Sequence, residues 1–332
     1  MAGPLVSVCI PVKSMARTIC QTVESAIAQT YDSIEVLVVD NCSEDETLEL
    51  VSAFRDPRIR VVRNETDVGV YGNHNRCVDL ARGEFLKFLH GDDLLKADCV
   101  ERMLEPFRGT GGEQIGLVAC GAVELDQAGV EFRWTPVPPR TIRISGNDFY
   151  EAVPSLGNFV GTPTMTLLRK ATVLEVGGFD PLIRHSADFD CWLALALSSD
   201  FAFIPHHLVN LRNDPPPADL SRRYNAEQII HYEMVLYKRY ARTLGSTPLW
   251  RSMLGRWMCR EAVLYTLAYG REALRGRPGP LRRLVAEFRR YGLLPQLLTQ
   301  IVVAGPSVMG RRLLGQHLTP YSAVEAYFAT LT

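Results

Sequence analysis

The sequence lacks the cysteine and N-terminal patterns of secreted or zinc-binding proteins. Its eight cysteines include no C-x-x-C pair and no other spacing typical of a zinc site. The first residues contain no basic segment, and their apolar run is shorter than a signal peptide needs. We therefore expect a cytoplasmic protein whose cysteines are small core residues in a reducing compartment.

Glycine-rich phosphate loops are also missing after the first predicted strand. Pro11-Val12-Lys13-Ser14 stands where G-x-G-x-x-G or G-x-x-x-x-G-K-[ST] would be expected. This disfavours dinucleotide oxidoreductases and P-loop NTPases. If the protein binds a diphosphate, a metal ion must neutralise most of its charge.

Positive and negative charges nearly balance over the whole chain, but they are unevenly distributed along it. The net charge of −1 excludes a generally basic nucleic-acid binder, and 47% hydrophobic residues exclude intrinsic disorder. Residues 232–332 hold 15 Lys and Arg against five Asp and Glu, so the remainder of the chain is acidic. Only five of the 36 basic residues are lysine, a bias typical of a GC-rich bacterial genome.

Hydrophobic patterning predicts alternating strands and helices over residues 1–125. Apolar runs at 5–12, 34–39, 59–62, 84–89 and 115–124 predict buried strands, and helices are expected to begin near residues 19, 43, 71 and 96. Ser43 and Glu46 have the spacing of a capping box. The pattern predicts an α/β fold with a mostly parallel sheet flanked by helices.

Beyond this region the pattern changes. Residues 126–160 are expected to be irregular, strands are expected at 161–169 and 201–209, and a helix is expected over 188–197. From residue 225 onward the chain is predicted to be helical and rich in arginine. We therefore expect a catalytic domain at 1–215 and a C-terminal helical region at 216–332.

The uncharged stretch at residues 291–310 lies between two arginine pairs. It is long enough to span a bilayer, but prolines, glycines and glutamines dilute its hydrophobicity. The alternatives are a membrane span, a helix on the membrane surface, and a helix packed on the catalytic domain or in a homodimer. Three interpretations of the nearby arginines remain open. They form a solvated helical face, they contact anionic lipid on the inner membrane face, or they bind an anionic acceptor. No nucleic-acid partner is expected, because aromatic stacking residues do not accompany the charge.

Carboxylates follow two of the predicted buried strands. Asp40 ends the second strand, and Asp92-Asp93 follow the fourth. In an open α/β sheet, ligands bind beyond the carboxyl ends of the strands. Adjacent carboxylates repel each other unless a cation or hydrogen-bond donors lie nearby, and oxygen ligands suit Mg²⁺ or Mn²⁺ together with substrate phosphates. The sequence therefore predicts a divalent metal and a diphosphate at this edge.

Three blocks of sequence occur in order between residues 5 and 215. They are VSVCIPVKSMARTICQTVESAIAQTYDSIEVLVVDNCSEDET at 6–47, VGVYGNHNRCVDLARGEFLKFLHGDD at 68–93 and GGFDPLIRHSADFDCWLALAL at 177–197. Together they resemble the family-2 inverting glycosyltransferases with the GT-A fold. The resemblance implies a nucleotide-sugar donor, with UDP expected, and an acceptor hydroxyl on a glycan, lipid-linked intermediate or secondary metabolite.

The resemblance also implies roles for nucleotide-binding residues. Asp40 would bind a uridine-type base, with Pro11 and Lys13 near the same nucleoside. Asp92 would face the ribose. Asn75 falls at a position that contributes to the nucleotide pocket.

Metal binding and catalysis are implied for two further aspartates. Asp93 would ligate the Mn²⁺ or Mg²⁺ ion that bridges the diphosphate. Asp188 matches the second residue of the family's Glu-Asp pair, the general base that removes a proton from the acceptor hydroxyl. Attack from the face opposite the diphosphate would invert the anomeric configuration.

The sequence departs from the family pattern at three places. His90 stands where many relatives carry the first acidic residue of the metal motif, which predicts weaker metal binding or contact between His90 and phosphate. Ala187 replaces the glutamate before the base. Arg212-Asn213 stands where some relatives place a metal-binding histidine.

Two alternative functions remain open. A sugar-phosphate nucleotidyltransferase would share the fold and the metal carboxylates, but it would normally have a glycine- and arginine-rich loop after the first strand. A non-catalytic nucleotide-binding protein is the other alternative, suggested by His90 and Ala187.

Overall fold

The computed structural model describes residues 3–126, 128–183, 186–212 and 320–331, together with positions 285 and 289. Residues 1–149, 158–215 and 324–332 form one compact unit, and residues 150–157 and 216–323 form a second. Most described residues belong to the first unit. Among the described residues, no helix has the length and apolar character needed to cross a membrane.

Several predictions for the C-terminal part fall outside the described residues. These are the helical, arginine-rich character of 216–319 and the membrane, surface or dimer contact of 291–310. They stay predictions, as does the domain boundary at residue 215.

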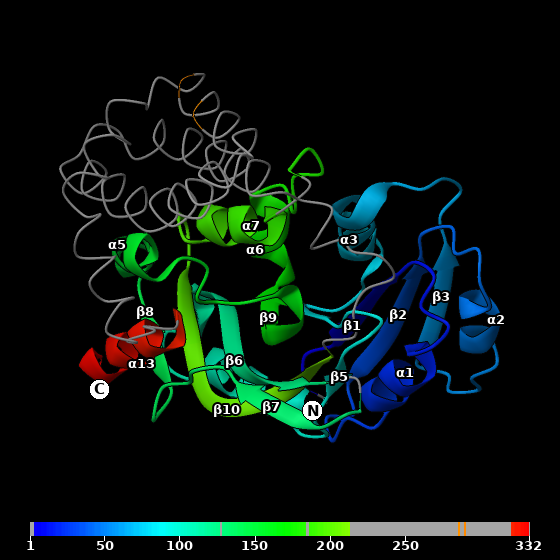
Figure 1. The fold of residues 1–332 in the computed structure, drawn as a ribbon, viewed down its shortest axis with the longest axis horizontal. Helices are drawn as coiled ribbons and strands as arrows, with labels where there is room; N and C mark the ends of the chain where they lie inside the picture. Colours follow the sequence, from blue (N-terminus) through cyan, green and yellow to red (C-terminus); the bar gives the residue numbers. More distant parts are fainter. Residues whose placement is uncertain are drawn as a thin grey trace, which may run out of the picture. The chain divides into compact units, whose positions relative to one another are not determined.

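A single ten-stranded sheet organises the first unit (Figure 1). Its main path runs β3-β2-β1-β4-β9-β6-β10-β5, with β7 paired to β6 and β8 paired to β10. The strands are β1 (Val6–Val12), β2 (Ile34–Asp40), β3 (Ile59–Arg63), β4 (Phe85–Phe88), β5 (Leu94–Leu95), β6 (Ile115–Leu125), β7 (Glu131–Trp134), β8 (Ile142–Ile144), β9 (Thr166–Arg169) and β10 (Asp200–Arg212).

The sheet is mostly parallel, as the sequence predicts. β1 pairs in parallel with β2 and β4, β2 with β3, and β6 with β10. β9 is antiparallel to both β4 and β6, which leaves those two strands running in the same direction. The carboxyl ends of β1, β2 and β4 therefore lie at one edge of the sheet.

Helices cover both faces of the sheet. The helices are α1 (Ile19–Ile27), α2 (Thr47–Ser52), α3 (Gly69–Leu80), α4 (Cys99–Arg108), α5 (Gly146–Leu156), α6 (Lys170–Glu175), α7 (Ala187–Leu195) and α13 (Pro320–Thr330), with single 3₁₀ turns η1 (Gly112–Gln114) and η2 (Pro163–Met165). Figure 1 shows α3 and α7 toward the top of the view and α1 toward the bottom, with the sheet between them.

Strand β1 shows how the two faces are filled. Val6, Val8 and Ile10 pack in one buried cluster with apolar side chains of α1 and α4. Successive side chains of a strand point to opposite faces, so Cys9 lies on the other face, where it contacts Cys77 of α3. Burial on both faces explains why β1 is a nearly continuous apolar run.

The structure differs from the prediction in two regions. Residues 126–160, expected to be irregular, contain β7, β8 and α5. Strand β7 is exposed along its whole length, so no hydrophobic run marks it in the sequence. The prediction of a capping box at Ser43 and Glu46 was wrong. Helix α2 begins at Thr47, whose N–H donates to the Asp45 carboxylate. The Ser43 hydroxyl instead accepts the N–H of Ser14.

The C-terminal helix α13 packs on the sheet unit through two apolar side chains. Val324 and Phe328 are buried, and the Phe328 ring lies 5.4 Å from the ring of Phe203 on β10. The helix therefore adds to the core although more than 100 residues separate it from β10 in sequence.

Replacing Phe328 with alanine should lower the free energy of unfolding by about 3–5 kcal/mol, because a buried aromatic side chain leaves a cavity. The measurement is the midpoint of urea unfolding of the full chain. Glu325→Ala, at an exposed position of the same helix, is the control. Equal midpoints for the two variants would show that α13 does not belong to the cooperative unit.

Candidate functional site

Asp40 lies at the end of β2, next to the end of β1. Val12 is its partner in the parallel register. The Asp40 side chain is buried, and the Ser43 N–H donates to its two oxygens at 3.3 and 3.2 Å. The guanidinium of Arg63, at the end of β3, lies 3.5 Å away. The chain thus places a buried carboxyl group with nearby donors at the strand ends, where the resemblance implies the base-binding residue.

Lys13 follows β1 at the same edge and pairs with Asp67. Its ammonium lies 2.5 Å from Asp67 Oδ2, and Asp67 Oδ1 accepts hydrogen bonds from the Asn41 amide and the Gly69 N–H. The hydrogen bond from Lys13 lowers the pKa of Asp67, and the same bond raises the pKa of Lys13. Pro11 lies within β1, partly buried, two residues before Lys13. The three predicted nucleoside contacts, Pro11, Lys13 and Asp40, therefore share one sheet edge.

Asp93 is the most enclosed of the predicted site carboxylates that follow β4. It is 4% exposed, its Oδ2 accepts the Thr164 hydroxyl at 2.8 Å, and its Oδ1 accepts the Arg212 N–H at 3.3 Å. Burial, followed by repulsion from the adjacent Asp92, raises the pKa of Asp93 to about 8. A cation at this carboxylate would favour its charged form and oppose both effects.

The contacts of Asp93 bring three segments together. Thr164 belongs to η2, and Arg212 ends β10. The Arg212 guanidinium donates to the side chain of Gln21 on α1. The structure therefore places position 212, where some relatives carry a metal-binding histidine, directly at the predicted metal carboxylate.

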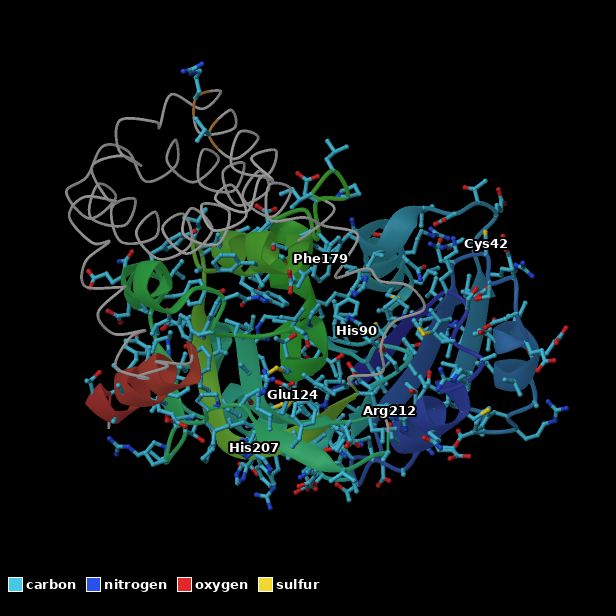
Figure 2. All side chains as sticks on the ribbon, viewed as in Figure 1. Cys42, His90, Glu124, Phe179, His207 and Arg212 are labelled. Carbon is cyan, nitrogen blue, oxygen red and sulfur yellow. The ribbon has the colours of Figure 1, made fainter. Side chains whose placement is uncertain are left out.

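His90 lies between Asp93 and helix α3. Its Nδ1 is 3.6 Å from Asp93 Oδ2, its Nε2 is 3.3 Å from His74 Nε2, and its backbone N–H donates to Thr164 Oγ1. Desolvation, followed by repulsion from the Lys87 ammonium, lowers the pKa of His90 to about 4. In Figure 2, His90 lies between Phe179 and Arg212.

Asp188 lies in the first turn of α7 and is partly buried. The Tyr71 hydroxyl of α3 donates to Asp188 Oδ1 at 3.4 Å. Desolvation raises the pKa of Asp188 to about 6, and the Tyr71 hydrogen bond opposes that rise. The Tyr71 hydroxyl thus contacts the Asp188 carboxylate at a place where Ala187 replaces the glutamate that the resemblance implies.

Helix α3 connects the two sets of acidic residues. From Asp188, contacts run through the Tyr71 hydroxyl to the His74 ring, whose centroid is 5.5 Å from that of Tyr71, and then through His90 to Asp93. The carboxylates at 93 and 188, 95 positions apart in sequence, are thus linked through a short series of side chains.

Sequence reasoning missed three residues of this site: Tyr71, His74 and Thr164. Tyr71 and His74 lie three positions apart on a correctly predicted helix, so their shared face was available as a signal. Thr164 gave no signal, because its contact with Asp93 crosses 71 positions.

Asn75, the remaining predicted nucleotide contact, has close partners within the protein. Its amide nitrogen donates to the Phe179 carbonyl at 2.7 Å, and its amide oxygen accepts the Phe179 N–H at 2.9 Å. Asn75 therefore ties α3 to the turn that precedes α7. A direct contact with nucleotide stays a prediction.

The side-chain donors at the end of β4 fit a hard divalent cation whose remaining ligands come from a substrate. In the part of the chain that the structure describes, no three His, Cys, Asp or Glu side chains form a complete metal cage. Mg²⁺-type sites commonly use one or two carboxylates and complete the shell with water and substrate phosphates. Asp93, with Asp92 adjacent and the His90 imidazole nearby, matches that requirement.

Comparisons with known proteins identify the family of the chain. The family model described as Glycosyl transferase family 2 matches residues 7–176. An uncharacterized protein of Mycobacterium tuberculosis is 32% identical over 218 residues, covering 62% of this chain and 66% of that protein. The UDP-Glc:alpha-D-GlcNAc-diphosphoundecaprenol beta-1,3-glucosyltransferase WfaP of Escherichia coli is 37% identical over 89 residues, covering 27% and 36%. The chain therefore spans less than two thirds of the length of each of these relatives.

Solved structures share the fold at low sequence identity. Staphylococcus aureus TarS 1–349 in complex with UDP-GlcNAc has a TM-score of 0.55 and 17% identity, covering 87% of this chain and 92% of that one. The mannosyltransferase PcManGT from Pyrobaculum calidifontis, in complex with GDP-Man and Mn²⁺, has a TM-score of 0.55 and 17% identity, covering 99% and 85%. Both are consistent with a GT-A architecture.

Asp188→Asn should change how stability depends on pH. An aspartate whose folded pKa is about 6, above the unfolded value of ~3.9, binds more protons in the folded state between those pH values. The wild-type free energy of unfolding therefore falls as pH rises through that window, and asparagine removes this loss. We expect the variant to gain about 1–3 kcal/mol relative to wild type between pH 4 and pH 7, measured by urea unfolding. Asp79→Asn, at an exposed position of α3, controls for loss of one charge; an equal gain there would contradict the prediction.

Proposed function

The chain belongs to glycosyl transferase family 2, and on that basis we propose that it transfers a sugar from a nucleotide donor to an acceptor hydroxyl with inversion of configuration. The observation that carries the proposal is the series of contacts that joins Asp188 to Asp93 through Tyr71, His74 and His90. In this reaction a general base and a diphosphate-binding carboxylate lie on either side of the anomeric carbon. Helix α3 connects the two carboxylates proposed for these roles.

The donor is a UDP-sugar bound at the ends of β1, β2 and β4. Asp40 accepts a hydrogen bond from the base, Pro11 and Lys13 contact the nucleoside, and Asp92 faces the ribose. Support comes from the shared sheet edge of these residues and from the UDP-GlcNAc complex of TarS, which has the same fold.

Asp93 would hold a divalent cation, Mn²⁺ or Mg²⁺, at the diphosphate end of the donor. When bound, such an ion supplies positive charge where negative charge grows on the leaving group. Thr164 and the Arg212 N–H keep the Asp93 carboxylate in one orientation by donating to its two oxygens. The complex of PcManGT with GDP-Man and Mn²⁺ supports this proposal.

Asp188 acts as the base. Its oxygen removes the proton of the acceptor hydroxyl while the hydroxyl oxygen bonds to the anomeric carbon and the bond to the diphosphate breaks. A base with a pKa of about 6 is largely ionised at neutral pH and still accepts a proton effectively, which suits this role. Tyr71 orients the carboxylate and is a positioning residue.

The acceptor is a hydroxyl of a glycan, a lipid-linked intermediate or a secondary metabolite. The glucosyltransferase WfaP acts on a diphosphoundecaprenol-linked sugar, which supports the lipid-linked class. That relative matches only 27% of this chain, so the support is for the class of acceptor alone.

Thermal unfolding with a panel of UDP- and GDP-sugars tests donor binding, because a ligand that binds only the folded state raises the Tm. We expect a rise with a UDP-sugar that is larger when Mn²⁺ is present. Release of UDP, with water as the substitute acceptor, tests turnover, and release of pyrophosphate instead would identify a nucleotidyltransferase. NMR of the released sugar reports its anomeric configuration; retention would contradict inversion.

Asp188→Asn should lower the rate of UDP release by about 10²–10⁴-fold, because the general base is lost. The Tm increase produced by UDP and Mn²⁺ should be unchanged, since Asp188 does not contact the donor diphosphate in this proposal. Asp79→Asn should keep wild-type turnover. Wild-type turnover in Asp188→Asn would exclude Asp188 as the base.

Tyr71→Phe should move the acidic limb of the kcat/KM profile for UDP release to higher pH. The hydroxyl stabilises the Asp188 carboxylate, so its removal raises the pKa above about 6 and lowers activity at pH 6 by roughly 2–10-fold. Tyr31→Phe, which removes a hydroxyl that donates to Pro4 away from the site, is the control. A uniform loss of activity at all pH values would indicate a purely structural role.

A further inference from the structure

His90 has contacts on both ring nitrogens, and together they determine what it can bind. We infer that His90 ligates the divalent cation through Nδ1, alongside Asp93, and that His74 holds it in the required tautomer. The inference rests on the proposed function, because it concerns the metal of the donor site. It departs from the expectation that His90 either weakens metal binding or contacts phosphate.

The tautomer of His90 follows from the partners of His74. His74 Nδ1 lies 2.9 Å from the Val70 carbonyl oxygen, which only accepts, so Nδ1 carries the proton. In a neutral imidazole the other nitrogen is then an acceptor. The contact of 3.3 Å between the two Nε2 atoms therefore requires His90 Nε2 to donate, which leaves His90 Nδ1 with its lone pair.

His74 is held neutral by its surroundings. It is 3% exposed and packs against the rings of Phe88 and Phe179, with centroids 5.1 and 5.3 Å away. A hydrogen bond on the distal nitrogen that fixes the tautomer is the usual arrangement for a metal-binding histidine.

The lone pair of His90 Nδ1 lies on the side of Asp93. Nδ1 and Asp93 Oδ2 are 3.6 Å apart, so both atoms can reach one ion at bond lengths of ~2.0–2.2 Å. Thr164 holds this pair together, because its hydroxyl donates to Asp93 Oδ2 and accepts the His90 N–H. A cation between them would stabilise two acceptor atoms that face each other at this distance.

A nitrogen ligand changes which metal the site prefers. Mg²⁺ is bound through oxygen ligands, whereas imidazole binds transition-metal ions. An Asp-His pair therefore favours Mn²⁺ over Mg²⁺, unlike a pair of carboxylates. The replacement of an acidic residue by His90 is thus a change of metal preference.

Electron spin-echo measurements of Mn²⁺ bound to the full chain with UDP test the assignment directly. We expect modulation from a directly coordinated ¹⁴N nucleus in the wild type. The absence of nitrogen modulation in the saturated complex would overturn the inference, and this outcome does not depend on any variant.

Variants test the two histidines separately through Mn²⁺ affinity, measured from the signal of free Mn²⁺. His90→Ala should lose the nitrogen modulation and weaken Mn²⁺ binding at least ~10-fold, and His74→Phe should weaken it by about 10–100-fold while keeping the ring packing. His90→Asp should bind metal without nitrogen modulation and with a lower ratio of Mn²⁺ to Mg²⁺ affinity.

His207→Ala is the control, because His207 Nε2 contacts the Thr135 carbonyl instead of the site. Unchanged Mn²⁺ affinity in His90→Ala would overturn the inference.

UDP-sugar binding and UDP release in the same samples separate this inference from the proposed function. Nucleotide binding and turnover without nitrogen modulation would overturn the ligand assignment alone. Nitrogen modulation in a Mn²⁺ complex that binds no nucleotide sugar would support the ligand assignment and overturn the proposed function.

Discussion

The burial of the Asp93 carboxylate is the constraint around which the site is built. A carboxylate that is 4% exposed and adjacent to a second aspartate is costly unless donors or cations compensate it. Thr164 and the Arg212 N–H supply hydrogen bonds, so η2 and the end of β10 must come to the end of β4. The fold therefore brings two distant segments to one side chain, and the candidate chemistry depends on that convergence.

Lys87 supports the same region from within the sheet. It is fully buried in β4, and its ammonium donates to the carbonyls of Thr164 and Thr166. A charged side chain in the middle of an apolar strand would ordinarily argue against burial. Here its hydrogen bonds hold the segment that carries the Thr164 hydroxyl, so the buried cation stabilises the Asp93 environment through its neighbours.

The sequence was informative wherever a signal was local. Apolar runs located β1, β2 and β4, and their parallel order placed Asp40 and Asp93 at one edge. Exposed β7 carries no apolar run, so pattern reasoning took it for irregular chain. The contacts of Asp93 with Thr164 and of Asp188 with Tyr71 are tertiary, and no spacing along the chain encodes these two pairs, so they were found only in the structure.

The paired hydrogen bonds between Asn75 and the backbone of Phe179 have a consequence for substrate exchange. They couple α3, which supports the histidines on the donor side, to the turn that leads into α7 and Asp188. A displacement of that turn would act directly on α3, which carries His74 next to Asn75 and Tyr71 one turn earlier. Occupancy of one substrate subsite should consequently alter the affinity of the other, which would make the two binding steps thermodynamically linked and their order kinetically meaningful.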